Sequence, residues 1–262
     1  MIDFISQLAQ QAGDLAAKRR KTLGSSQIHT KNTETDLVTD VDREVENFII
    51  SALQKKTPGY GIFGEESGFD RNPSPWCWVI DPIDGTTSFV HDLPFYCVSI
   101  GLRYQGRGVL GAVYSPKLGE LFLAESGKGT TLNGEKVRVS AISELKQAVV
   151  ATGFSCVRAK REFDNLKLMP DIVHNTCAFR RSGSAALDLA YVACGRLEAF
   201  WELALAPYDI AAGEVLVREA GGTVSDMLGG SDCPARGTLA SNGLIHEKML
   251  KFFDIPGGVQ FC

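Results

Sequence analysis

The hydrophobic pattern of this chain changes near Leu145, and that change constrains the fold more than any other feature of its 262 residues. Before Leu145, short apolar runs follow one another closely, and a typical hairpin turn, Asn133-Gly134, precedes the last of them. These strand-like runs are residues 76–80, 97–103, 109–114, 120–124 and 136–139. Closely spaced strands with tight turns predict an antiparallel sheet.

Two amphipathic segments precede these strands. The first carries apolar side chains at helical spacing from Ile5 to Ala16, and the second does so from Val41 to Leu53. Thr39 or Asp40 is suited to cap the second helix. The first part of the chain therefore has an α+β composition, with two helices and an antiparallel sheet.

After Leu145, strands and helices alternate along the chain. The expected strands are residues 148–152, 197–201 and 222–225, and the expected helices are residues 160–169, 184–194 and 209–220. This alternation predicts an α/β layer. We therefore expect two subdomains, residues 1–143 and 144–262, with a cleft between them as the default ligand site.

Composition and charge argue against several classes of function. The 27 Lys and Arg against 31 Asp and Glu give a net charge of −4, which argues against a general binder of nucleic acids or anionic membranes. The longest uncharged stretch, residues 147–157, is too short to span a bilayer, and the N-terminus lacks a signal-peptide pattern. The net charge thus favours a small-molecule ligand. The seven cysteines form no C-x-x-C pair, so we expect reduced thiols and a cytoplasmic location.

The most informative segment is residues 81–87 (DPIDGTT), which directly follow the apolar run 76–80. Pro82 cannot donate to a strand ladder, so the strand is expected to end there. That ending would turn Asp81, the Ile83 carbonyl and Asp84 toward one point as oxygen ligands for a hard divalent cation. Gly85 permits close backbone approach, and a helix that begins after it offers free N–H groups to a phosphate.

Charge supports a cation at this segment. No Lys or Arg occurs from residue 72 to residue 102, so nothing local neutralises the two aspartates. Two carboxylates ~4 Å apart repel by about 4 kcal/mol at an effective dielectric near 20, so converging carboxylates need a cation or remain protonated. Magnesium suits oxygen-only ligation. A lone D-x-x-D also fits a helix cap followed by a turn, and that alternative stays open.

Two other acidic segments are each weak indications alone. Residues 64–67 (GEES) follow a strand-like run, and residues 208–213 (YDIAAG) place an acid at the start of a helix. A solvated acidic turn and a helix N-cap are the simpler interpretations of these two segments.

Taken together, the motifs resemble those of the inositol monophosphatase family. Residues 36–39 (DLVT) with Asp42, and residues 183–186 (GSAA), join the three segments above in the family's order and approximate spacing. The resemblance implies a layered αβαβα sandwich, an α+β part stacked with an α/β part. It also implies a magnesium-dependent, lithium-sensitive phosphomonoesterase that is usually a homodimer.

The resemblance also implies roles for individual residues. The first metal would be held by Glu65, Asp81, the Ile83 carbonyl and Asp84, and the second by Asp81, Asp84 and Asp209. Most of these ligands come from residues 1–143, whereas Asp209 and the substrate pocket come from residues 144–262.

The remaining implied roles concern water and substrate. Thr86 would orient the attacking water together with Glu65, and Asp42 would support Thr86. The phosphate would meet the backbone of Gly85 and Thr86. The substrate pocket would be formed by Gly183, Ser184, Ala185, Asp209 and Glu202, the last of which would receive substrate hydroxyls.

Some positions depart from the family pattern or remain ambiguous. Ser88 stands where the family usually has Asn, and Tyr208 stands where Trp usually precedes the aspartate. Arg180-Arg181 fit either a second substrate phosphate or a solvated or dimer-facing pair. The basic residues 18–21 (KRRK) fit a nucleic-acid contact or simply the negative end of a helix dipole. The four histidines are scattered, so no histidine catalysis is expected.

The sequence thus predicts magnesium-dependent hydrolysis of a small phosphate monoester, inositol 1-phosphate or a similar polyol phosphate, by metal-activated water. The alternatives are a sugar-bisphosphate phosphatase acting on fructose 1,6-bisphosphate, a nucleotide 3′-phosphatase, and a catalytically idle binding module of the same fold.

Overall fold

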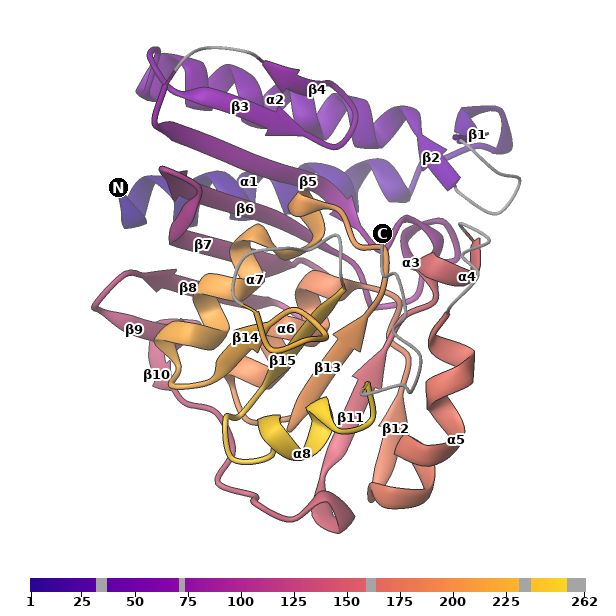
Figure 1. The fold of residues 1–262 in the computed structure, drawn as a ribbon. Helices are drawn as coiled ribbons and strands as arrows, with labels where there is room; N and C mark the ends of the chain where they lie inside the picture. Colours follow the sequence, from indigo (N-terminus) through magenta and orange to yellow (C-terminus); the bar gives the residue numbers. More distant parts are fainter. Residues whose placement is uncertain (32–36, 71–73, 159–163, 231–236, 254–262) are drawn as a thin grey trace.

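The computed structural model describes residues 1–31, 37–70, 74–158, 164–230 and 237–253. Within these ranges the chain forms five stacked layers (Figure 1): two helices, an eight-stranded sheet, two helices, a five-stranded sheet and a group of outer helices. Three clusters of buried apolar side chains fill the spaces between the layers. The predicted αβαβα sandwich is therefore confirmed.

The first layer contains α1 (Ile2–Arg20) and α2 (Asp40–Lys56), which cover one face of the larger sheet (Figure 1). Ile5 of α1 and Ile49 of α2 are buried in one cluster with Trp78 of that sheet. Both helices thus bury the apolar stripe that the sequence predicted. Between the two helices in the sequence, the chain forms η1 (Ser25–Gln27) and a two-stranded sheet of β1 (Ile28–Thr30) and β2 (Leu37–Thr39).

Thr39, and not Asp40, caps helix α2. The Thr39 hydroxyl accepts a hydrogen bond from the Val41 N–H at 3.2 Å, and Asp42 Oδ2 accepts one from the Thr39 N–H at 2.8 Å. These reciprocal bonds form a capping box. Asp42 therefore has a structural partner of its own at the start of the helix.

The eight-stranded sheet has the order β10-β9-β8-β7-β6-β5-β3-β4. Neighbouring strands are antiparallel, as expected, except that β3 runs parallel to β5. Asn133 and Gly134, both with positive φ, form the predicted hairpin turn between β9 and β10. The strands are β3 (Gly61–Gly64), β4 (Gly68–Asp70), β5 (Trp76–Asp84), β6 (Cys97–Tyr104), β7 (Arg107–Ser115), β8 (Glu120–Glu125), β9 (Gly129–Leu132) and β10 (Glu135–Val137).

Strand β5 does not end at Pro82, so that prediction was wrong. The strand continues to Asp84, and its pairing with β6 shifts between Asp81, opposite Ser99, and Asp84, opposite Cys97. Three steps along β5 thus match two along β6, which is a β-bulge. The bulge accommodates the proline, which cannot donate to the ladder, and brings two side chains three positions apart to the same face.

The middle layer consists of α6 (Ala185–Ala193) and α7 (Pro207–Glu219), which lie between the two sheets (Figure 1). Glycines allow α7 to approach the larger sheet closely. A Cβ added to Gly111 of β7 would lie 2.4 Å from the Ala212 carbonyl oxygen, a distance that requires the helix to move. Residues of the second half of the chain therefore pack directly on the sheet built by the first half.

The five-stranded sheet has the order β12-β11-β13-β15-β14. Strand β11 runs parallel to β12 and β13, whereas β15 is antiparallel to β13 and β14. Outside it lie η2 (Leu145–Gln147), α4 (Ser155–Arg158), α5 (Asn165–Asn175) and α8 (His246–Leu250). The strands are β11 (Val149–Thr152), β12 (Ala178–Arg180), β13 (Ala199–Glu202), β14 (Thr223–Ser225) and β15 (Thr238–Ser241).

One helix boundary in this half was predicted wrongly. The expected helix 160–169 is α5, which begins at Asn165 and continues past Pro170 to Asn175. Asp164 caps it by accepting a hydrogen bond from the Leu166 N–H at 2.9 Å, while residues 159–163 lie outside the described part. The cap, rather than the apolar spacing, sets the start of this helix.

Three further expectations concern the whole chain. No helix in the described ranges is both long and apolar enough to cross a membrane. The described cysteines are free, while Cys233 and Cys262 lie outside the described residues. The division into subdomains 1–143 and 144–262 stays a prediction, although the larger sheet ends at β10 and the smaller one begins at β11.

Candidate active site

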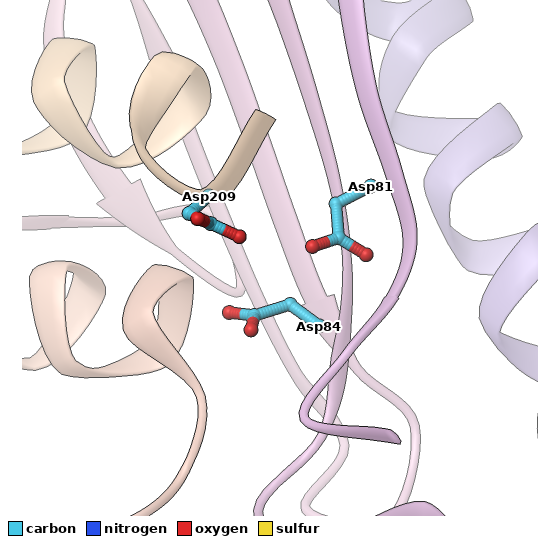
Figure 2. A group of neighbouring side chains, drawn as sticks. All are labelled: Asp81, Asp84 and Asp209. Atoms are coloured by element: carbon cyan, nitrogen blue, oxygen red, sulfur yellow. The ribbon is translucent and has the colours of Figure 1, made fainter. Parts of the chain in front are cut away.

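Three aspartates converge where the larger sheet meets the middle helices. Asp81 and Asp84 come from the bulged end of β5, and Asp209 comes from the first turn of α7, and Figure 2 shows their carboxyl groups turned toward one another. One carboxylate oxygen of each lies within 4.8 Å of the others. Asp84 and Asp209, 125 positions apart in the sequence, thus lie close together because α7 packs against the larger sheet.

Burial makes the negative charge of this cluster costly. The pKa of Asp81 lies well above its usual range because burial opposes its charge and because Glu65, Asp84 and Asp209 repel it. Burial also raises the pKa of Asp84 to about 7, against the opposing effect of its hydrogen bonds, and raises that of Asp209 well above the usual range. Three such groups are charged together only when a cation lies between them.

The donor set fits a divalent metal ion. All the groups are carboxylate oxygens, which hard cations prefer. In the described part of the chain, no lysine or arginine forms an ion pair with Asp81, Asp84 or Asp209. The cluster is therefore a place that can hold a divalent cation.

Glu65 lies beside the cluster, directly after β3. Its N–H donates a hydrogen bond to the Ile80 carbonyl at 3.1 Å, and its carboxylate accepts one from Lys31 Nζ at 2.7 Å. Burial still raises the pKa of Glu65 because it outweighs the attraction of Lys31. Lys31, which also contacts Glu66, was not predicted from the sequence, because 34 positions separate it from Glu65 without a local pattern.

Thr86 connects the pocket to a buried aspartate. Its hydroxyl lies 3.1 Å from the Ile83 carbonyl oxygen and 3.3 Å from Asp42 Oδ1, and it donates toward these acceptors. Asp42 is fully buried, and burial raises its pKa to about 7 despite its hydrogen bonds from Thr39. Asp42 thus reaches the pocket only through Thr86.

The backbone at Gly85 requires a glycine. Its φ of 93° is left-handed, and an added Cβ would lie 2.6 Å from the Phe95 carbonyl oxygen. Helix α3 (Thr86–Val90) begins directly after it. Gly85 and Thr86 both line the pocket described below.

The second half of the chain supplies the opposite wall. Ser184 Oγ and the Ala186 N–H donate hydrogen bonds to Asp84 Oδ2 at 2.7 Å and 2.6 Å. Glu202 is buried and accepts a hydrogen bond from the Ser155 N–H at 2.9 Å. The starts of α6 and α4 therefore hold two carboxylates of the pocket, Asp84 and Glu202, in place.

The resulting pocket has a volume of about 110 Å³. Every predicted site residue lines it except Asp42, namely Glu65, Asp81, Ile83, Asp84, Gly85, Thr86, Gly183, Ser184, Ala185, Glu202 and Asp209. Arg181 also lines it, whereas Arg180 does not. The structure thus brings these residues together, and their individual chemical roles stay predictions.

The family-pattern departures lie near the pocket. Ser88 is buried in α3, and the Tyr208 ring packs edge-on against Phe63, with 5.8 Å between ring centroids. Asp36, part of the first motif, lies outside the described residues.

Comparison with known proteins extends the similarity to whole chains. A model of the inositol monophosphatase family matches residues 1–254. Inositol-1-monophosphatase from Synechocystis sp. (strain ATCC 27184 / PCC 6803 / Kazusa) is 44% identical over 225 residues, covering 85% of this chain and 78% of that protein. Nus factor SuhB from Escherichia coli (strain K12) is 43% identical over 253 residues, covering 95% of this chain and 94% of that protein.

The fold has solved counterparts as well. The structure of inositol monophosphatase from Anabaena (Nostoc) sp. PCC 7120 matches with a TM-score of 0.86 and 35% identity, covering 96% of this chain and 94% of that one. The family match, the relatives and the solved fold agree over nearly the entire length. This chain therefore belongs to the inositol monophosphatase family of phosphomonoesterases.

Proposed function

We propose that the protein hydrolyses a small polyol phosphate, such as inositol 1-phosphate, with magnesium as its cofactor. The observation that carries the proposal is the buried cluster of Asp81, Asp84 and Asp209, whose oxygens lie within 4.8 Å of one another. Magnesium suits this set because it prefers carboxylate oxygens and binds together with substrate phosphates.

The chain's own residues would divide the work as follows. The cations would be held by Glu65, Asp81, Asp84, Asp209 and the Ile83 carbonyl. When bound, they would supply positive charge for the phosphate and lower the pKa of a water molecule. The backbone of Gly85 and Thr86 contacts the phosphate oxygens. Glu65 and the Thr86 hydroxyl orient the attacking water, and Asp42 positions Thr86 by accepting its hydrogen bond.

The substrate class follows from the opposite wall. Glu202 is a buried acceptor suited to the hydroxyl groups of a polyol, and Gly183, Ser184 and Ala185 leave space because their side chains are small or absent. The small volume of about 110 Å³ favours a compact phosphate monoester.

Arg181 favours a second candidate substrate. It lines the same pocket, so its guanidinium could receive a second phosphate, as in fructose 1,6-bisphosphate or a nucleotide 3′-phosphate substrate. The two candidate functions therefore differ in whether the enzyme prefers a substrate with one phosphate or a substrate with two.

The same proposal includes three properties of the whole enzyme. The family resemblance implies inhibition by lithium and a homodimer, and the cysteine pattern favours a cytoplasmic location. Lithium inhibition is checked by adding lithium chloride to the inositol 1-phosphate assay, and the homodimer by light scattering of the purified protein.

A substrate panel tests the proposal. Inositol 1-phosphate, fructose 1,6-bisphosphate, adenosine 3′,5′-bisphosphate and histidinol phosphate are compared by kcat/KM with saturating magnesium. We expect inositol 1-phosphate to rank first, and a higher kcat/KM for fructose 1,6-bisphosphate or adenosine 3′,5′-bisphosphate would instead support the second candidate. A well-folded protein that hydrolyses none of the four would contradict the proposal and support an idle binding module.

A further inference from the structure

A larger cavity lies outside the candidate active site. Its volume is about 420 Å³, and it shares no lining residue with the carboxylate pocket. Its walls come from the β6–β7 turn, from α7 and from the β14–β15 region. Arg103, Arg107 and Arg218 line it, so three arginines border one space.

Arg103 has an unused donor in this cavity wall. It lies near the end of β6, where the pairing with β7 shifts in register, and its Nη2 donates a hydrogen bond to Glu214 Oε1 at 3.2 Å. Its Nε is buried and has no hydrogen-bond partner among the described residues. Solvent does not reach this Nε, so a ligand would contact the part of the Arg103 side chain that remains exposed, 18% of it.

The other two arginines have little intramolecular compensation. Arg107 is exposed and forms no side-chain hydrogen bond or ion pair within the described ranges. Arg218 donates to a neutral group, the Val224 carbonyl, at 2.9 Å. Both therefore keep donors for an anion.

Two acidic residues also line the cavity, but both have partners. Glu214 is the carboxylate already paired with Arg103. Asp226 Oδ1 accepts hydrogen bonds from the Leu228 and Gly230 N–H groups, at 2.8 Å and 2.7 Å, within its own turn. The three arginines against these two acids leave an excess of positive charge in the cavity.

Part of the wall is apolar. Ile210, Val215 and Val224 line the same space, so a ligand can bury hydrocarbon beside its charged group. The volume lies in the range of sites for small organic molecules.

We infer that this cavity is a second binding site, for a small organic anion that carries a phosphate or carboxylate group next to a short apolar part. The planar forks of the guanidinium groups match both kinds of oxyanion. The site is separate from the proposed catalytic pocket, although α7 contributes to both, through Asp209 there and Ile210 here.

Removing metal ions separates the two sites in an experiment. Without a cation, the carboxylates of the active-site pocket repel an anion, whereas the arginine cavity still attracts one. Phenylphosphonate and benzoate are suitable probes because each joins an oxyanion to an apolar ring and neither is a phosphate ester. Their binding to the EDTA-treated full chain is measured by titration calorimetry.

We expect saturable binding of at least one probe, with one molecule per chain, and the stronger probe identifies the preferred oxyanion. Arg107→Gln, at an exposed position, should weaken it by about tenfold or more, as should Arg103→Gln if its melting temperature is retained. Arg181→Gln, in the other pocket, should leave it unchanged. The absence of saturable binding, or binding that Arg181→Gln removes and Arg107→Gln does not, would overturn the inference.

Discussion

The Thr86 hydroxyl has two near acceptors, the Ile83 carbonyl oxygen at 3.1 Å and Asp42 Oδ1 at 3.3 Å. With its proton held by these groups, its oxygen can accept a hydrogen bond from a water molecule in the pocket. We expect Thr86→Ala to lower kcat by about 10²- to 10⁴-fold, as for loss of a proton relay, with little change in KM. Thr86→Ser should retain much of the activity.

A matched control separates this effect from a lost structural hydrogen bond. The Thr22 hydroxyl donates to the Arg19 carbonyl at 3.1 Å and does not line the pocket, so Thr22→Ala removes the same kind of bond. Steady-state kinetics of the three variants check the prediction. If Thr86→Ala kept more than about a tenth of the wild-type kcat, the hydroxyl would have no part in orienting water.

Glu202 tests the substrate side of the pocket. Glu202→Gln keeps an oxygen for the hydrogen bond from the Ser155 N–H but removes the charge offered to substrate hydroxyls. We expect the variant to raise KM for inositol 1-phosphate more than it lowers kcat, because the contact lies away from the reacting phosphorus. A monoester without hydroxyl groups, phenyl phosphate, is the control substrate, and equal changes in KM for both substrates would contradict the proposed role.

At the level of single residues, the sequence predicted the positions that line the pocket but not all of their contacts. Asp81 and Asp84 were identifiable because they are close together in a segment without basic residues. The capping bond between Asp42 and Thr39 was not predicted, nor was the ion pair of Lys31 with Glu65. The ion pair joins two segments that are distant in the sequence, so no local pattern predicts it.

At the level of elements, α7 links the candidate metal cluster to the larger sheet. A Cβ on Gly111 would lie 2.4 Å from the Ala212 carbonyl oxygen, so Gly111→Ala must push the helix away from β7. We expect a loss of about 1–3 kcal/mol in the free energy of unfolding, as for overpacked cores. The magnesium concentration for half-maximal activity should also rise, because Asp209 moves with the helix.

Gly59→Ala is the control for this change, because an added Cβ there meets no atom within 4 Å. Chemical denaturation and magnesium-dependent activity are measured for both variants. Destabilisation of Gly111→Ala without any change in its magnesium dependence would show that α7 does not set the position of the cluster.

Elements with strong periodicity were predictable, and irregular ones were not. Helices α1 and α2 follow clear apolar spacing, whereas β5 continues through Pro82 only because a bulge places the proline where no ladder bond is needed. Strand β9, of four residues, is too short to show alternation, and it exists because β8 and β10 pair with it. Tertiary pairing, rather than local propensity, decides such segments.

At the scale of the whole molecule, metal binding and folding are coupled through pH. Burial raises the pKa of Asp84 to about 7 and those of Asp81 and Asp209 well above their usual range. Without metal, the folded state thus binds more protons than the unfolded state, so stability falls as pH rises from about 4 through about 7. Under the proposed function, bound magnesium would hold the charged carboxylates and offset this loss.

We therefore expect magnesium to raise the melting temperature more at pH 8 than at pH 5, by about 5 °C or more at a concentration one hundredfold above its dissociation constant. Sodium chloride at equal ionic strength is the control. Scanning calorimetry at both pH values checks this. An equal or larger shift at pH 5 would mean that magnesium does not bind to these carboxylates.

We propose that carboxylates from both halves of the chain hold the cation that hydrolysis requires. Turnover of inositol 1-phosphate is measured against magnesium concentration for the EDTA-treated wild type, for Asp84→Asn, and for Asp171→Asn, an exposed position on α5. We expect magnesium to restore turnover saturably in the wild type and Asp171→Asn, but not in a folded Asp84→Asn. Wild-type turnover without magnesium, or a wild-type-like kcat of Asp84→Asn at saturating magnesium, would contradict it.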